Sequence, residues 1–247
     1  MIRKSFYLIL TGIIIGAILV FLRKPIITGE LTKQTLYLWL LNIFHHQTTD
    51  ALPTVMLVDD DSGDGIFGIR QICKEIGIKA TFAIIPSRLD SIKTDSLRLW
   101  QKEGYSIALH GYNHDRWKDW TFEEIINDIN QSEKLLQKYG LKPNSRFVVP
   151  PHACNTNNIR KAIQSKGYLM ITSANIINPD KTVFQYGRFS LYADSPTLEE
   201  ARRILTAAYK KKGFVIFGTH SSTKGAFSEE KTKAILAMAK EMGFIFI

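Results

Sequence analysis

Two histidines four residues apart, His110 and His114, are the side chains whose type and spacing most readily support chemistry. They follow a short apolar run at residues 105–109, which predicts a buried strand that ends in a loop at Gly111. Neutral imidazoles are common ligands of transition metals, and a single turn of backbone brings two of them to one ion. The alternative is a hydrogen-bonded core histidine followed by a solvated one. A metal site therefore requires a carboxylate as well.

Three consecutive aspartates, Asp59, Asp60 and Asp61, supply the carboxylates. They follow the β-branched, apolar run at residues 54–58, which predicts another buried strand. Adjacent carboxylates repel one another at a strand end, and a cation or a shared proton relieves that repulsion. A solvated acidic turn or a calcium loop is the alternative, but Arg70 occupies the position where a calcium loop needs its final glutamate. Together with the histidines, one of these aspartates predicts a transition-metal site.

Two later apolar runs also end in polar or titratable residues. The run at residues 147–149 leads into Pro151 and His152, and the run at residues 214–218 leads to His220. The carboxyl ends of parallel strands lie at one edge of an α/β fold, and such folds carry their sites there. We therefore expect these residues to gather beside the aspartates and the histidine pair.

In this order, the motifs resemble those of the metal-dependent polysaccharide deacetylases of the NodB-homology type. The resemblance extends from about residue 54 to residue 247. The matching residues follow, in order, the first, third and fourth predicted strands and a late strand: Asp59 and Asp60, His110 and His114, Pro150 and Pro151, and His220. The alternation of strands and helices by itself predicts a parallel barrel or an open doubly wound sheet. The resemblance implies the barrel, in a distorted form with about seven parallel strands.

The resemblance also implies an activity and a set of roles. The implied reaction is the hydrolytic removal of N-acetyl or related acyl groups from a polysaccharide or glycan, at a carbon–nitrogen bond other than a peptide bond. It implies one divalent metal, for which Zn²⁺ is the expected ion. The residues in these roles are Asp60, His110 and His114 for the metal, Asp59 as catalytic base, His220 as catalytic acid, and Pro151 and His152 for substrate.

Four positions depart from the usual pattern of that family. Gly111 follows the first metal histidine, where Ser or Thr is usual, and Asp61 follows the aspartate pair in place of Gly. Val149 and His152 stand where the family carries an Arg that orients the base and a Tyr. These departures leave a second function open, that of a glycan-binding or assembly protein that keeps the fold and the metal site without deacetylation.

Substitutes for two missing partners are present elsewhere in the chain. Arg116 or Arg188 would replace the missing arginine if the fold brings one of them near the base. No Asp-x-x-Asp-Trp segment is found to orient His220, and Asp194 is the candidate for that role.

The first 24 residues predict a membrane anchor. Residues 6–22 contain no charge and are flanked on both sides by basic pairs. At about 1.5 Å per residue, this run is near the lower limit for crossing a bilayer. No small-residue cleavage site follows, which argues against a removed signal peptide. We expect a single-pass anchor with the catalytic domain outside the cytoplasm, although the symmetric basic flanks do not fix the orientation.

The remaining chain divides into a juxtamembrane segment at residues 25–53 and one domain at residues 54–247, which is long enough for a substantial core. Capping boxes at Thr121 and Thr197 predict two helix starts. The net charge of +9 is spread along the chain without a nucleic-acid motif, so we expect no nucleic-acid partner.

Overall fold

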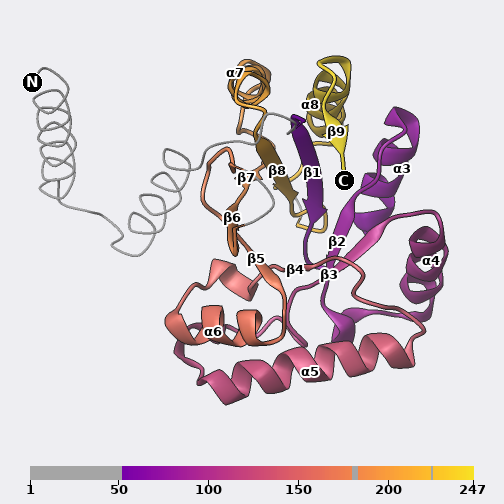
Figure 1. Ribbon diagram of the computed structural model, residues 1–247. Coiled ribbons are helices and arrows are strands. Elements are labelled where there is room, and N and C mark those ends of the chain that lie inside the picture. The colour runs from indigo at the N-terminus through magenta and orange to yellow at the C-terminus, as the bar shows by residue number, and fades with distance from the viewer. Residues whose placement is uncertain (1–51, 180–182, 224) are drawn as a thin grey trace, which may run out of the picture.

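The computed structural model describes residues 52–179, 183–223 and 225–247. The predicted anchor at residues 1–24 and the juxtamembrane segment as far as residue 51 lie outside these ranges. None of the helices within the described ranges is long and apolar enough to cross a bilayer. Figure 1 shows the described part as a set of strands with helices around them.

The strands form one sheet in the order β6-β5-β4-β3-β2-β1-β8-β7, and β9 pairs with β1. All the pairings between these strands are parallel. Their bounds are β1 (Thr54–Asp59), β2 (Thr81–Ile84), β3 (Ser106–Leu109), β4 (Phe147–Val148), β5 (Leu169–Thr172), β6 (Gln185–Gly187), β7 (Phe189–Ser190), β8 (Phe214–Thr219) and β9 (Ile245–Phe246).

The sheet closes into a near-barrel at a single residue. Arg188 alone separates β6, which pairs with β5, from β7, which pairs with β8. Residues 185–190 thus act as one bent strand that changes partner half-way along its length. This arrangement confirms the parallel α/β barrel that the family resemblance implies.

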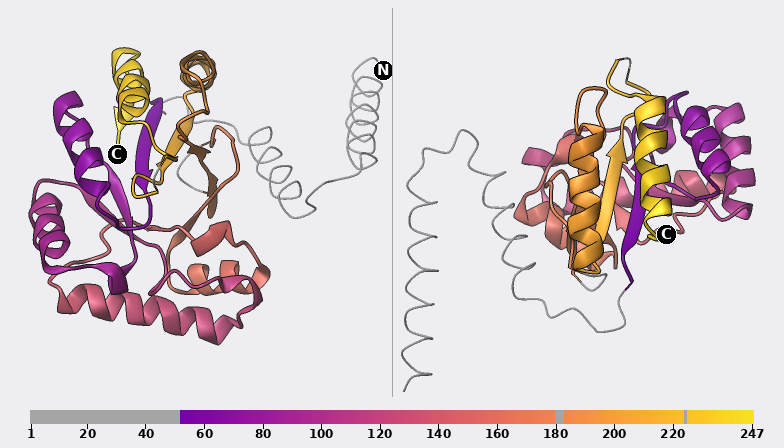
Figure 2. Two further views of the ribbon diagram at one scale, coloured as in Figure 1. Left: turned by 180° about the vertical axis from the view of Figure 1, so that it is seen from behind. Right: turned by 90° about the horizontal axis from the view of Figure 1, so that it is seen from above.

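Within the described residues, six helices lie outside the strands. The two views of Figure 2 show how they surround the sheet. They are α3 (Ile66–Ile76), α4 (Ser91–Lys102), α5 (Phe122–Lys138), α6 (Asn157–Ser165), α7 (Leu198–Lys210) and α8 (Glu229–Glu241). Three short 3₁₀ turns, η1 (Pro86–Arg88), η2 (Trp117–Asp119) and η3 (Pro151–Ala153), follow strand ends. Both predicted capping boxes are confirmed, because Thr121 and Thr197 each exchange hydrogen bonds with the glutamate three residues later.

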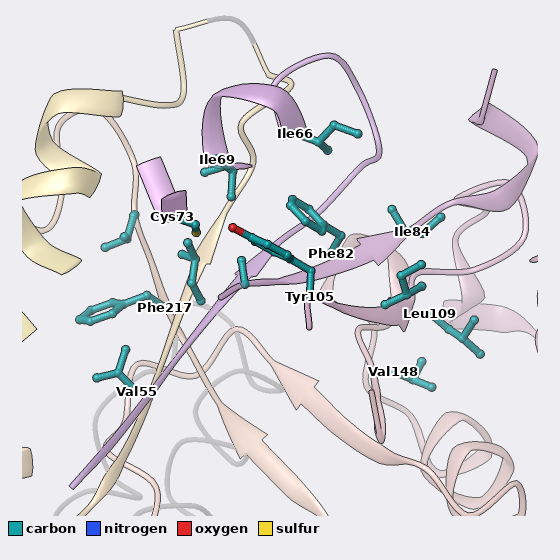
Figure 3. Close-up of a cluster of buried hydrophobic side chains, with 14 of the residues drawn as sticks. Val55, Ile66, Ile69, Cys73, Phe82, Ile84, Tyr105, Leu109, Val148 and Phe217 are labelled. Carbon is teal, nitrogen blue, oxygen red and sulfur yellow. The ribbon is translucent and has the colours of Figure 1, made fainter. Parts of the chain in front are cut away.

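Alternation along β1 sorts its side chains into two cores. Val55 and Leu57 belong to the large cluster between the sheet and the helices, part of which Figure 3 shows. Met56 and Val58 belong to a smaller cluster with Ala108 and other residues inside the barrel. Since successive side chains of a strand point to opposite faces, the next residue, Asp59, points outward toward the helices, and Asp60 continues the inward row.

Candidate metal centre

Three side chains at the carboxyl ends of β1 and β3 could hold one metal ion. Asp61, His110 and His114 each offer one ligand atom, and these atoms all lie within 4.8 Å of one another. The Nε2 atoms of His110 and His114 lie 3.5 and 3.3 Å from Asp61 Oδ1. Within the described ranges, that carboxylate oxygen is buried and has no hydrogen-bond donor. An oxygen and two imidazole nitrogens facing one another in this way suit a transition-metal ion such as Zn²⁺.

A hydrogen bond to the backbone fixes the orientation of the first histidine ring. His110 is buried, and its Nδ1 lies 2.6 Å from the carbonyl oxygen of Val149. A carbonyl oxygen can only accept, so Nδ1 carries a proton, and Nε2 is the ring atom that faces the cluster and can bind a metal when it is unprotonated. Burial, followed by the proximity of His110, lowers the pKa of His114 to about 4. His114 is therefore neutral near pH 7, as a metal ligand must be.

The backbone around the cluster adopts conformations that are unfavourable for most residues. Asp61 and His114 both have positive φ, 79° and 64° respectively, and so does His152 at 54°. Non-glycine residues rarely adopt this region, and such strain concentrates at functional sites. At Asp61, the strand has already turned, so its side chain no longer follows the alternation of β1.

Asp60 lies inside the barrel beside a different set of partners. It is fully buried, and its Oδ2 lies 2.7 Å from an Nη atom of Arg188 and 3.5 Å from Nε2 of His220. Burial alone would raise the pKa of Asp60. The charges of Arg188 and His110 overcome that effect and lower the pKa below its ordinary value. Asp60 is thus a charged carboxylate held against a guanidinium and one imidazole.

Asp59 points away from this group and binds the β8 strand end instead. The hydroxyl of Thr219 donates to its Oδ1 at 2.6 Å, and Ser221 donates through its backbone N–H at 3.0 Å and through its hydroxyl at 2.6 Å. Burial raises the pKa of Asp59 to about 7, although these hydrogen bonds lower it in part. Because Thr219 and Ser221 flank His220, Asp59 fixes the backbone that carries this histidine.

The geometry therefore differs by one position from the register predicted for the aspartates. Asp61, in place of Asp60, lies between the two histidines, and Asp60, in place of Asp59, faces His220. The physical reason is the alternation of β1, which turns Asp59 toward the helices. The roles of these residues remain predictions.

Of the two candidate arginines, Arg188 is the one that the fold brings to the aspartates. It is 4% exposed, and it reaches Asp60 from the junction of β6 and β7. Arg116, the other candidate, is exposed. Asp194 is exposed as well, whereas the ring of Tyr192 lies parallel to that of His220 with the ring centroids 6.0 Å apart.

Pro151 and His152, which the sequence predicts as substrate contacts, lie beside the histidine loop. His152 is exposed at the rim, donates from Nε2 to the carbonyl oxygen of His114 at 3.1 Å and has its ring 4.4 Å from the His114 ring. Pro151 is buried under the loop, where a Cβ atom on Gly111 would come within 2.7 Å of its Cγ. Their contact with substrate remains a prediction.

Sequence reasoning missed one residue that supports the site. Asp128 on α5 is buried, and its Oδ1 accepts a hydrogen bond of 2.7 Å from the backbone N–H of Tyr112, between the two histidines. Burial raises the pKa of Asp128 to about 6. The only available signal was an aspartate among apolar helix positions, which the spacing of α5 places on its inner face.

Comparison with known proteins places the chain in a family. The model of the polysaccharide deacetylase family matches residues 46–171, which are 126 of the 247 residues. The chain belongs to the polysaccharide deacetylase family. A curated relative, an uncharacterized protein of Methanocaldococcus jannaschii, is 25% identical over 123 residues, which cover 47% of this chain and 49% of that protein. The chain thus matches about half the length of that relative.

Solved structures of this family share the fold. A family 4 acetyl xylan esterase from Clostridium thermocellum, in complex with a cobalt ion, is 19% identical with a TM-score of 0.58, covering 78% of this chain and 87% of that one. The catalytic domain of a peptidoglycan N-acetylglucosamine deacetylase from Eubacterium rectale is 15% identical with a TM-score of 0.57, covering 82% and 91%. A CE4 family pseudoenzyme from Bacillus anthracis is 14% identical with a TM-score of 0.57, covering 81% and 65%. At these identities the similarity establishes the barrel alone.

Proposed function

We propose that this member of the polysaccharide deacetylase family is a metal-dependent hydrolase that removes N-acetyl or related acyl groups from a glycan. The observation that carries the proposal is that a possible metal-ligand cluster and a charged carboxylate lie side by side at the strand ends. One is the ligand cluster of Asp61, His110 and His114, and the other is Asp60 with its buried Arg188 partner. A metal site beside a charged, oriented carboxylate is the arrangement that amide hydrolysis needs.

The ligand cluster would hold a divalent ion, for which Zn²⁺ is our first candidate because of the nitrogen and oxygen donors. Such an ion would supply Lewis-acid polarisation of the acyl carbonyl and a lowered pKa for bound water. Three protein ligands leave further coordination positions open, as catalytic sites require. The hydrogen bond from His110 to Val149 keeps the ring in the tautomer that can bind.

Asp60 is our candidate for the general base. Its low pKa keeps it charged, and Arg188 holds Oδ2 at 2.7 Å, which fixes the carboxylate in one orientation. Fixing a base in this way is the role that the family's arginine at the Val149 position would otherwise perform. The arginine has a different sequence position here and reaches the carboxylate over Gly218 of β8, the strand between β7 and β1.

His220 is our candidate for the general acid. Burial lowers the pKa of His220, which favours the neutral ring, and a neutral ring is available to receive a proton. The neighbouring Asp60 Oδ2, 3.5 Å away, is placed to pass on the proton it has taken, and Nε2 would then deliver that proton to the departing amine. Asp59 contributes by holding Thr219 and Ser221 in place on either side of His220.

The substrate class follows from the family and from the rim of the site. One structural relative is named as a peptidoglycan N-acetylglucosamine deacetylase, so N-acetylated amino-sugar polymers are the first substrates to test. We retain Pro151 and His152 as proposed substrate contacts, and His152 has the exposed imidazole that such a contact needs. We also retain the proposal of a single-pass anchor at residues 6–22, with the domain outside the cytoplasm.

A second candidate function is glycan binding without deacetylation. Val149 and His152 favour it, because the family's arginine and tyrosine are absent from those positions. One structural relative with the same fold is itself named as a pseudoenzyme. The ion pair between Arg188 and Asp60 favours the catalytic alternative, because it restores the partner of the base.

Metal content and acetate release, measured together, separate the two functions. The purified protein should contain about one divalent metal per chain and should release acetate from at least one acetylated oligosaccharide in a panel. A chelator should abolish this release, and added Zn²⁺ should restore it. Retention of metal and glycan binding without acetate release would instead establish the second function.

A further inference from the structure

Charged residues are distributed unequally between the two ends of the barrel. The first turns of α5, α7 and α8 carry glutamates, and the last turns of α3, α4, α5, α7 and α8 carry lysines. Since the helices run antiparallel to the strands, their first turns lie at the end with the metal centre and their last turns at the opposite end. Helix dipoles account for one charge per helix terminus.

The barrel end away from the metal centre carries more lysines than the one per helix terminus that helix dipoles explain. Three consecutive lysines, residues 210–212, lie where the chain leaves α7 for β8. Lys79 lies where the chain leaves α3 for β2. We call the following exposed residues around the start of β1 the lysine patch: Lys74, Lys79, Lys210, Lys211, Lys212 and Lys240. Three exposed glutamates are acidic exceptions at this end: Glu241 beside Lys240, Glu75 beside Lys74, and Glu103 after α4. Glu75 pairs with Lys233, and Glu103 pairs with Arg70.

Hydrogen bonds tie the segments of the patch to one another. The backbone N–H of Thr54, at the start of β1, donates to Gly213 after the lysine run. Ile245 donates to Pro53, and the ammonium of Lys240 donates to the carbonyl of Ile76 at the end of α3. The ends of α3, α7 and α8 therefore form one continuous surface around the start of β1, and the right-hand view in Figure 2 shows β1 starting at the same side as the ends of α7 and α8.

Apolar side chains are exposed within the same surface. Leu52 is 60% exposed, Tyr209 is 46% exposed and Ile245 is 42% exposed. Exposed apolar residues among lysines are typical of surfaces that lie against the headgroups of a bilayer, because the lysines reach the phosphates while the apolar side chains enter the interface. A polyanion such as a nucleic acid would leave those apolar side chains without a partner.

The position of the patch in the chain indicates which surface it meets. The described residues begin at Leu52, inside the patch, and the preceding sequence contains the uncharged apolar run at residues 6–22. A chain that enters the barrel at this end brings it toward the membrane that the apolar run is proposed to cross.

We propose that the lysine patch, with Leu52, Tyr209 and Ile245, docks on the anionic headgroups of a lipid bilayer. The metal centre at the other ends of the strands then faces away from the bilayer. This orientation presents the site to polymeric glycan at a distance from the membrane rather than to lipid-linked sugars. The proposal is independent of deacetylation and rests on the patch and on the proposed anchor.

The orientation of the full chain in lipid nanodiscs tests the proposal. Cys73 and Cys154 are buried, so a fluorophore can be attached selectively to an introduced cysteine. Glu241→Cys places the dye in the patch, and Glu123→Cys places it at the first turn of α5, at the other end of the barrel. Both substitutions remove one exposed negative charge, so they are matched. Energy transfer to an acceptor lipid is then compared between nanodiscs of phosphatidylcholine alone and nanodiscs that also contain phosphatidylglycerol.

We expect stronger transfer from position 241 than from position 123, with a larger difference in the anionic nanodiscs and a smaller one at high salt. The triple variant Lys74→Gln, Lys210→Gln, Lys211→Gln should lose the dependence on lipid charge. A control triple variant, Lys118→Gln, Lys134→Gln, Lys161→Gln, removes the same number of exposed charges outside the patch. Energy transfer in this control should still depend on lipid charge. The proposal is overturned if energy transfer is the same in neutral and anionic nanodiscs. It is also overturned if the two triple variants reduce the transfer equally.

Two further readouts keep this test separate from the other proposals. If the full chain does not enter nanodiscs, flotation with anionic vesicles replaces the measurement. Binding that salt and the patch variant abolish then supports docking, and no binding overturns it. Acetate release by detergent-solubilised patch variant should equal that of the wild type, so a failure of the deacetylation proposal is recognised independently.

Discussion

Three consecutive aspartates in this chain have three different environments. Asp59 accepts hydrogen bonds at the helix-facing side, Asp60 faces an arginine inside the barrel, and Asp61 lies between two histidines after the strand has turned. Their pKa values differ accordingly. Burial raises the pKa of Asp59 to about 7, whereas the adjacent His110, followed by the other nearby imidazoles, outweighs burial at Asp61 and lowers its pKa to about 2. Residues of one type thus acquire separate properties from backbone geometry alone.

The first prediction separates Asp60 from Asp61. Asp61→Asn should lose the metal, because a neutral amide is a poorer ligand than a carboxylate beside two imidazoles. Asp60→Asn should keep the metal and lower acetate release roughly 100- to 10,000-fold, the range typical of a lost general base. Metal analysis and turnover on the same preparations test this. The reverse result would restore the register in which Asp60 is the ligand.

The second prediction concerns the dependence of stability on pH at Asp59. Its pKa is raised from an ordinary 3.8 to about 7 in the folded state, so the fold binds this proton more tightly than the unfolded chain does. Its favourable contribution is therefore complete below 3.8 and is lost as the pH rises to about 7. Relative to Asp59→Asn, the wild type should lose free energy of unfolding across this window. Urea titrations at intervals of pH measure the difference, and two parallel curves would contradict the assignment.

At the scale of elements, the loops after β1, β3 and β4 position the site. The turn between His110 and His114 is held from one side by Asp128 of α5, through the N–H of Tyr112, and packs on the other side against Pro151. Gly111 permits this close packing, since its φ is +74° and its α-carbon faces the proline ring. This local geometry accounts for the glycine where the family usually carries Ser or Thr.

The third prediction compares two glycines with nearly the same backbone conformation. Gly111→Ala and Gly167→Ala, at φ of +74° and +76°, should each cost about 1–2 kcal/mol of stability through backbone strain. At Gly111 the new methyl group would also lie 2.7 Å from Pro151, whereas nothing lies within 4 Å at Gly167. Only Gly111→Ala should therefore weaken metal binding, which calorimetric titration of the apoprotein measures. Equal affinities in the two variants would show that the loop tolerates the displacement.

Sequence reasoning succeeded for elements whose signals are local. The capping boxes at Thr121 and Thr197 correctly predicted the starts of α5 and α7. The strands β6 and β7 had no such signal, because each contains two or three residues and their pairing is decided by distant partners. Arg188 was for this reason only a conditional candidate. The register of the aspartates needed the exact end of β1, and element boundaries are the least certain part of any sequence prediction.

At the scale of the whole molecule, the barrel keeps its two ends chemically distinct. One end carries the candidate metal centre, and the other carries the lysine patch and the entry of the chain from its N-terminal segments. A parallel barrel produces this separation directly, because the strands all point the same way and the connections alternate between the two ends. Substrate chemistry and attachment can then change independently of one another.

The fourth prediction concerns attachment. The full-length protein should stay in the membrane fraction after a high-salt wash, because residues 6–22 bury apolar surface that salt does not release. A form that lacks residues 1–24 should be released by the same wash. Fractionation followed by immunodetection measures both, and N-terminal sequencing of the mature protein tests for cleavage. Release of the full-length chain by salt alone would replace the anchor with a peripheral association.

The position of Arg188 at the junction of β6 and β7 has a consequence for the order of folding. The guanidinium reaches Asp60 only when residues 185–190 have paired with β5 on one side and β8 on the other. Asp60 and Arg188 are 128 residues apart in the sequence, and we expect their contact to form late because the entropy of closing a long loop must be overcome first. A partly folded chain whose strands have not yet closed into the barrel would therefore have the histidine pair but lack the ion pair between Arg188 and Asp60. The proposed activity would then require that ring closure be complete.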